Sequence, residues 1–82
     1  MWLRTIENEL LNLDKIVAVK VNNLGNSICV YAVGAVPDCK EYLVQKCNSK
    51  EKAKKLMNTI AECMRVKTNY IDTNMLMVDI GD

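Results

Sequence analysis

The residues best suited to bind or react with a ligand are lysines crowded into one short stretch. Lys50, Lys52, Lys54 and Lys55 stand close together, and the span 40–67 holds eight basic against three acidic residues, a net charge of 8 − 3 = +5. Clustered ammonium groups attract phosphate, nucleotides or an acidic protein surface. The same lysines also suit a solvated face that keeps a small protein soluble. Both interpretations are open from the sequence.

The residue types needed for catalysis are largely missing from the chain. The chain has no histidine, so the usual general base near neutral pH is missing. Its three glycines are not spaced as a phosphate-binding loop. Asp14 and Asp38 fall in predicted turns, where aspartate commonly bonds to the backbone. We expect no catalytic residues and no enzymatic activity.

The cysteines are spaced too widely for a zinc ribbon. Cys29, Cys39, Cys47 and Cys63 have 9, 7 and 15 residues between them and form no CxxC pair. We expect reduced thiols that pack as small hydrophobic groups. A disulfide and a metal site made by all four cysteines are the alternatives. The sequence therefore predicts neither a metal site nor a cofactor.

The lysines belong to the best-defined predicted element, a helix over Ser49 to Met64. Its apolar residues fall at i, i+3, i+4, i+7, i+8 and i+11, which makes one stripe on an α-helix: Ala53, Leu56, Met57, Ile60, Ala61 and Met64. Asn48 or Ser49 is the predicted cap, and Glu51 stands three residues after Asn48, as in a capping box. Such a stripe requires a sheet to cover it.

The rest of the chain predicts strands joined by short turns. The expected strands are Trp2–Ile6 and Leu10–Leu13, forming a hairpin around residues 7–9, then Ile16–Val21, Ser27–Val36 with a bulge at Gly34, and Lys40–Cys47. Short connections favour antiparallel order. The predicted fold class is α+β: one mostly antiparallel five- or six-stranded sheet with one amphipathic helix on a face. Residues 1–82 are expected to form a single domain.

The C-terminal segment is unusually apolar for the end of a small protein. After a polar connection over 67–74, Met75 to Ile80 is expected to form a strand that is apolar on nearly both faces. This strand either inserts into its own sheet or contacts a second copy. Because one helix covers only one face of a sheet, we favour a homo-oligomer in which residues 70–82 take part. Its predicted interface residues are Met75, Leu76, Met77, Val78 and Ile80.

A ligand site is expected between subunits, near Arg4, Lys20 and the Lys50 to Lys55 end of the helix, with Trp2 or a tyrosine stacking on the ligand. The candidate ligand-binding residues are Trp2, Arg4, Lys20, Tyr31, Tyr42, Lys50 and Lys54. Each aromatic ring has an alternative structural role. Trp2 is either a lid on the core or a stacking anchor, and the two tyrosines are either a core or interface pair or a stacking platform for nucleic acid.

The chain shows no sign of a membrane segment or a secretion signal. No apolar run approaches the roughly 18 residues that a membrane span needs. The N-terminal residues MWLRTIENELL lack the apolar core and cleavage site of a signal peptide. We expect a cytoplasmic protein without membrane contacts.

The order of segments resembles a known kind of protein. MWLRT, then ELLNLDKIVAVKV, then two further strands and SKEKAKKLMNTIAE, over about residues 1 to 65, resemble small proteins of low-GC Gram-positive bacteria and their prophages. The resemblance implies a phage or mobile-element setting, where small proteins act stoichiometrically by disabling a host defence protein or sequestering a nucleotide signal. A non-catalytic binding protein for an anionic ligand is therefore the predicted function. A nucleic-acid-binding module that uses the sheet face and basic helix, and a purely structural oligomeric subunit, are the alternatives.

Overall fold

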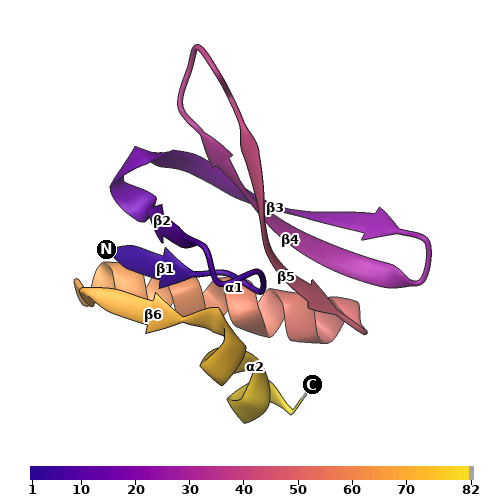
Figure 1. The fold of residues 1–82 in the computed structure, drawn as a ribbon. Coiled ribbons are helices and arrows are strands. Elements are labelled where there is room, and N and C mark those ends of the chain that lie inside the picture. Colours follow the sequence, from indigo (N-terminus) through magenta and orange to yellow (C-terminus); the bar gives the residue numbers. More distant parts are fainter. Residues whose placement is uncertain (82) are drawn as a thin grey trace.

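The computed structural model describes residues 1–81 and contains two small sheets and two α-helices (Figure 1). In chain order the elements are β1 (Trp2–Arg4), β2 (Leu10–Asn12), a 3-10 turn η1 (Leu13–Lys15), β3 (Ile16–Leu24), β4 (Ser27–Gly34), β5 (Glu41–Cys47), α1 (Lys50–Arg65), β6 (Tyr70–Asp72) and α2 (Thr73–Ile80). The predicted α+β class is confirmed. The predicted single five- or six-stranded sheet is wrong, because the strands form two three-stranded sheets, β2-β1-β6 and β3-β4-β5.

The chain divides into two sheets at η1. The Asn12 side chain accepts a hydrogen bond from the Asp14 backbone N–H at 3.1 Å and so caps this turn, while Leu13 is buried beneath it. The turn redirects the chain between β2 and β3, so these two strands do not pair. The expectation that Leu10–Leu13 and Ile16–Val21 belong to one sheet is therefore wrong.

The larger sheet is the antiparallel meander β3-β4-β5, as predicted from the short connections. A two-residue turn joins Leu24 to Ser27, and Gly25 has φ +61°, which suits a glycine at the first central position of a hairpin turn. The predicted irregularity near Gly34 lies instead on the opposite strand, where the register shifts between Ile16 and Ala18. The loop after β4 holds a cis peptide bond between Val36 and Pro37.

Helix α1 forms as predicted and supplies the centre of the core. Ser49 is the N-cap, and its hydroxyl accepts a hydrogen bond from the Lys52 backbone N–H at 3.2 Å. The capping box expected between Asn48 and Glu51 is wrong, because Ser49 is the cap. Three members of the predicted apolar stripe are buried, Ala53, Leu56 and Ile60. The remaining three, Met57, Ala61 and Met64, lie at its margin and are only partly covered or exposed.

Part of the predicted polar connection over 67–74 forms β6, the third strand of the smaller sheet. Strand β6 lies parallel to β1 with Trp2 opposite Tyr70, and the Trp2 backbone N–H donates to the Asn69 carbonyl at 2.9 Å. Its central residue, Ile71, is buried at 6 % exposure beside Leu3. One inward-facing apolar residue was too weak a sequence signal to predict a strand, whereas pairing with β1 is sufficient to form one.

The predicted C-terminal strand is wrong, because Met75 to Ile80 belongs to helix α2. The Asp72 carboxylate accepts from the Asn74 backbone N–H at 2.9 Å and caps its start. Gly81, with φ +87°, ends the helix, and its N–H donates to the carbonyls of Met77 and Val78. Helices this short are not stable alone, so tertiary contacts must hold α2 in place.

A polar network supplies those contacts. The buried Gln45 side-chain amide of β5 donates to the Thr73 hydroxyl at 3.0 Å and to the Asn74 side-chain oxygen at 2.7 Å. Thr73 in turn donates to the Arg4 carbonyl, and the Asn74 amide donates to the Thr5 carbonyl at 3.2 Å. The network therefore ties α2 to one strand of each sheet.

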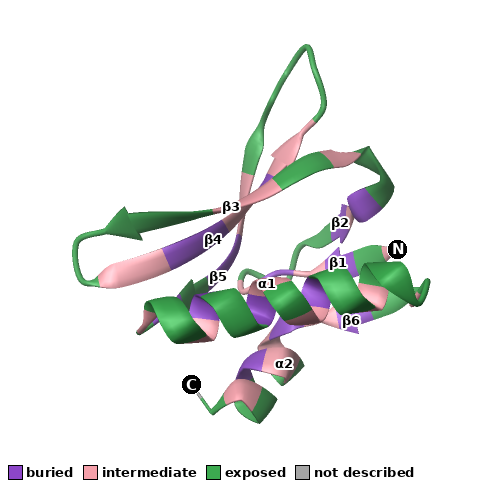
Figure 2. Ribbon diagram, turned by 180° about the vertical axis from the view of Figure 1, so that it is seen from behind, coloured by how far each residue is buried: buried purple, intermediate pink, exposed green. Residues whose placement is uncertain are grey.

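Both sheets and both helices share one hydrophobic core. It joins residues from β1, β2, η1, β4, β5, α1, β6 and α2: Leu3, Leu11, Leu13, Val30, Ala32, Val44, Cys47, Ala53, Leu56, Ile60, Ile71 and Met77. Figure 2 shows that the buried residues of α1 alternate with exposed ones, while much of β3 is exposed at the margin of its sheet. Neither helix in residues 1–81 is long and apolar enough to span a bilayer.

Candidate functional site

The structure brings two of the predicted lysines to a groove, which we call the lysine groove. It has a volume of about 470 Å³ and lies between the β3–β4 hairpin and the first turns of α1, with Val21, Asn23, Ile28, Lys50, Lys54 and Met57 as its lining. Figure 1 shows this hairpin extending alongside the N-terminal half of α1. The volume is within the range of about 300 to 1,000 Å³ typical of small-molecule sites.

Local structure explains why these six side chains converge. Lys50, Lys54 and Met57 follow the spacing i, i+4 and i+7, so they share one face of α1. Val21 and Asn23 alternate along β3 and therefore point to the same side of the sheet, where Ile28 is opposite Asn23. The site thus has an apolar floor, one amide and two ammonium groups.

The lysine groove carries an uncompensated positive charge. Within residues 1–81, neither Lys50 nor Lys54 forms an ion pair or a side-chain hydrogen bond. Two other basic residues have carboxylate partners: Lys20 pairs with Glu41 at 3.0 Å, and Arg65 pairs with Glu62. The hydrogen bond from Arg65 lowers the pKa of the Glu62 carboxyl. Free ammonium groups beside apolar side chains are suited to an anion that also has an apolar part.

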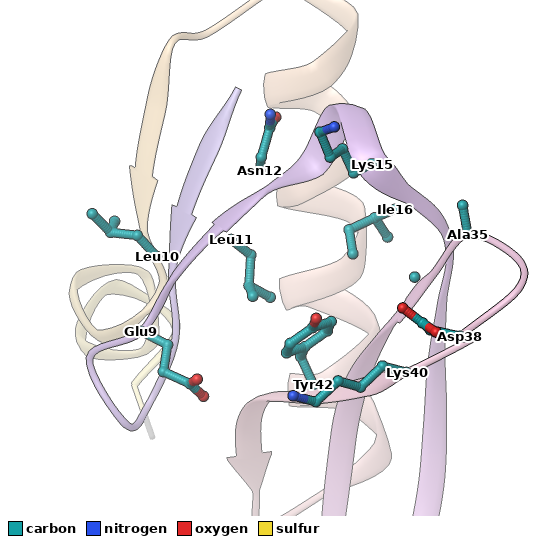
Figure 3. Close-up of a pocket in the computed structure, with 11 residues that line it drawn as sticks. Glu9, Leu10, Leu11, Asn12, Lys15, Ile16, Ala35, Asp38, Lys40 and Tyr42 are labelled. Atoms are coloured by element: carbon teal, nitrogen blue, oxygen red, sulfur yellow. The ribbon is translucent and has the colours of Figure 1, made fainter.

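A second cavity lies between the two sheets and has a balanced charge (Figure 3). Its volume is about 400 Å³, and its lining includes Glu9, Asp38, Lys15, Lys40 and Tyr42. The Lys40 ammonium lies 5.2 Å from the centre of the Tyr42 ring, a cation–π distance. Because two acidic and two basic side chains face this space, it has no net attraction for an anion.

The predicted pair Trp2 and Arg4 lies elsewhere, on the outer face of the sheet β2-β1-β6. Trp2 is 49 % exposed, so it is not a lid on the core. The Arg4 guanidinium donates to the Tyr70 hydroxyl at 3.0 Å and to the Asn8 carbonyl at 3.2 Å. The Tyr70 contact raises the pKa of the Arg4 guanidinium. These residues do not line the lysine groove.

The predicted residues Lys20, Tyr31 and Tyr42 are also separated from the groove. Lys20 is opposite Tyr31 on the outer face of the sheet β3-β4-β5, whereas Tyr42 is opposite the buried Ala32 on the inner face. The expected pair of neighbouring rings is therefore not formed. Burial raises the pKa of the Tyr31 phenol, and the adjacent Cys29 adds to this effect.

The five predicted interface residues of the C-terminal segment have different environments in α2. Met75 and Val78 are exposed at 64 % and 71 %, Leu76 and Ile80 are partly buried, and Met77 is buried in the core. Met77 is thus part of the protein's own core, and only the other four remain accessible.

Within residues 1–81, the four cysteines are not joined by disulfide bonds, and they differ in exposure. Cys29 and Cys47 are buried, Cys63 is partly buried and Cys39 is exposed. The prediction of buried thiols therefore holds for Cys29 and Cys47 and is wrong for Cys39. In the described part of the chain, no three Cys, Asp or Glu residues are grouped so that they could hold a metal ion.

No protein-family model, curated protein or solved structure matches this chain significantly. The functional argument therefore rests on the lysine groove itself. Sequence reasoning identified Lys50 and Lys54 but missed Val21, Asn23, Ile28 and Met57. The helical spacing of Met57 and the strand alternation of Val21 and Asn23 were the available signals, but only the folded hairpin shows that these two faces meet.

Proposed function

We propose that this protein is a non-catalytic binding protein that holds a small, nucleotide-type anion in the lysine groove. The single observation that carries the proposal is the pair Lys50 and Lys54, free of carboxylate partners within residues 1–81, at the edge of an apolar groove. An anionic group would neutralise the ammonium pair, and a flat apolar group would contact Val21, Ile28 and Met57. Sequestering such a ligand would allow a small protein to inhibit a host defence stoichiometrically, the role suggested by the resemblance of residues 1 to 65.

The nucleic-acid-binding alternative has less support. A sheet-face module for single strands uses aromatic rings side by side, whereas Tyr31 and Tyr42 lie on opposite faces. The sheet's outer face also pairs Lys20 with Glu41, which reduces its attraction for phosphates. A small ligand at two lysines and a long strand at many lysines differ in salt dependence, so they can be separated by experiment.

The test is the affinity of purified protein for ATP, measured by calorimetry at several salt concentrations. Lys54→Glu should weaken binding by about 10-fold or more, because it replaces an attractive ammonium with a repulsive carboxylate near the ligand. The matched control is Lys55→Glu, which makes the same charge change one residue away, outside the groove lining. Native mass spectrometry of protein purified from its host gives a second readout, a retained small molecule.

Three outcomes contradict the proposal. Equal losses for Lys54→Glu and Lys55→Glu would show attraction to the whole basic helix rather than to the groove. A steep fall in affinity for an oligonucleotide with salt, together with no binding of ATP, would favour the nucleic-acid module. Absence of any retained or added anion, with wild-type protein folded, would leave the lysines as a solvated face.

A further inference from the structure

In the part of the chain that the structure describes, the outer edge of β3 has no partner strand. β3 pairs with β4 on one side, and no strand in residues 1–81 pairs with its other side. Natural proteins usually keep such edges short, charged or covered, because the unpaired N–H and C=O groups can pair with another chain. β3 is nine residues long, and its one charged residue, Lys20, is already paired with Glu41.

The hairpin register shows which backbone groups are unpaired. Leu24 and Ser27 flank the two-residue turn and therefore form a hydrogen-bonded pair. From this pair back to Ala18, the even-numbered residues direct their backbone groups toward β4. The intervening residues direct theirs away from the sheet: Val19, Val21 and Asn23.

We propose that β3 pairs antiparallel with β3 of a second copy of this chain, with the two-fold axis at Val21, so that two three-stranded sheets become one of six strands. The register supports this axis. Beyond the shift between Ile16 and Ala18, the regular part of β3 runs from Ala18 to Leu24, and its midpoint is Val21. An axis at Val21 pairs every residue of this run, whereas any other position leaves some of them unpaired.

Side-chain complementarity supports the same register. With Val21 on the axis, Val19 is opposite Asn23, and Lys20 is opposite Asn22 of the partner subunit. An axis at Lys20 would instead bring two like charges together, which destabilises an antiparallel pair. Along the paired strands, the backbone groups of β3 are therefore satisfied without two charged side chains opposite each other.

Exposed apolar side chains lie next to the β3 edge and would add to the area that strand pairing buries. A stable interface buries about 800 Å² on each partner, more than a single strand edge provides. Next to this edge, Val17 is 67 % exposed, Val21 is 39 % exposed and Met64 of α1 is 51 % exposed. Met64 lines a pocket with Val17, and Met57 lines the lysine groove with Val21. A second copy alongside β3 would cover this uncovered margin of α1.

The same pairing has a consequence for the ligand site, and this step rests on the proposed function. Val21 and Asn23 form the β3 side of the lysine groove, so the grooves of two copies meet across the axis. The joined site would hold Lys50 and Lys54 from both subunits. It would therefore favour a ligand with two anionic groups over one with a single charge. The strand pairing itself does not depend on ligand binding.

The oligomeric state is tested by sedimentation equilibrium from about 1 µM to about 1 mM, the range of transient and moderate interfaces. Wild-type protein should approach the dimer mass of 2 × 9.3 = 18.6 kDa. Val21→Lys should weaken dimerisation at least 10-fold, because it puts two ammonium groups on the axis. The matched control, Val78→Lys, changes an exposed valine of α2 and should leave dimerisation intact. Circular dichroism checks that both variants are folded.

A purely monomeric wild type over this range would overturn the proposal, and so would a dimer lost in Val78→Lys but retained in Val21→Lys. The latter result would assign the interface to α2. Lys50→Glu combined with Lys54→Glu should abolish ATP binding yet keep the dimer, so failure of the proposed function and failure of this interface are distinguishable.

The register has its own test in a Cys39→Ser background, which removes the exposed thiol. Val21→Cys should form an intersubunit disulfide under mild oxidation, because the two Cα atoms of an on-axis pair are about 5.5 Å apart. Val19→Cys should not, because its two copies are offset by four residues, about 13 Å along the strand. Efficient cross-linking at Val19 and none at Val21 would refute the proposed axis.

Discussion

Replacing Gln45 with alanine tests how α2 is held on the protein. Gln45 is 3 % exposed, and its amide donates to both Thr73 and Asn74 at the start of α2. Gln45→Ala removes both hydrogen bonds and leaves an empty space between β5 and α2. Because α2 is only eight residues long, it should lose its position when these contacts are lost.

The magnitude follows from the contacts. Two hydrogen bonds contribute about 1 kcal/mol each, and the unpaired Asn74 oxygen and lost packing add about 1 to 2 kcal/mol. The free energy of unfolding should therefore fall by about 3 to 4 kcal/mol. A chain of this size has a total stability of only about 4 to 12 kcal/mol, so the loss is a large share.

Urea denaturation followed by circular dichroism measures the change, and hydrogen exchange locates it. Exchange should accelerate most at the amides of Thr73 to Ile80. Lys46→Ala is the matched control, since this neighbouring residue of β5 is exposed. If Gln45→Ala changes stability no more than Lys46→Ala, or if exchange in α2 is unaltered, the network does not hold α2.

Two further predictions concern the core and the outer sheet face. Leu56→Ala should lower the free energy of unfolding, measured by urea denaturation, by about 2 to 5 kcal/mol, because Leu56 of α1 is fully buried. The control Lys55→Ala should change the free energy of unfolding by less than about 0.5 kcal/mol. Equal effects of the two substitutions would contradict the position of α1. Burial raises the pKa of the Tyr31 phenol above its ordinary value of 10.0, so ionisation of this phenol disfavours the folded state. The stability linked to Tyr31 is therefore complete below about pH 10 and falls as the pH rises further. Absorbance titration at alkaline pH should show that Tyr31→Phe removes an ionisation raised above the ordinary pKa of 10.0, and an unchanged titration curve would contradict the partial burial of this ring.

The elements predicted well are those whose sequence pattern is complete within one segment. Helix α1 has a cap, a continuous apolar stripe and no interrupting glycine or proline, and the structure confirms it. The hairpin of β3 and β4 has alternating residues on both sides of a glycine turn, and it is confirmed as well. In both elements, the conformation that the local sequence favours is also the conformation that buries one apolar face.

The elements predicted wrongly depend on partners distant in the chain. The apolar residues of Met75 to Ile80 suit either a buried strand or a short helix, because such runs carry no clear period. Caps at Asp72 and Gly81, together with the bonds from Gln45, select the helix. Strand β6 forms because it pairs with the edge of β1, whose residues lie 72 − 4 = 68 positions earlier than their partners.

The residues of the lysine groove were likewise predictable only in part. Charge patterning identified Lys50 and Lys54, but the same search for basic and aromatic residues also selected Trp2, Arg4 and Lys20, which do not line the lysine groove. Nothing in the spacing of residues reveals that Lys20 has a carboxylate partner on another strand or that Lys54 has none within residues 1–81.

By itself, the sequence determined the α+β class, helix α1, the central hairpin and the basic character of one helix face. Each of these follows from interactions between residues close in the chain, whose geometry the covalent backbone already restricts. Only the tertiary structure decided that the strands divide into two sheets, that the last apolar segment is a helix, and that the β3–β4 hairpin meets Lys50 and Lys54. Those outcomes depend on contacts between residues distant in the chain, such as the pairing of β6 with β1 and the hydrogen bonds from Gln45 to the start of α2.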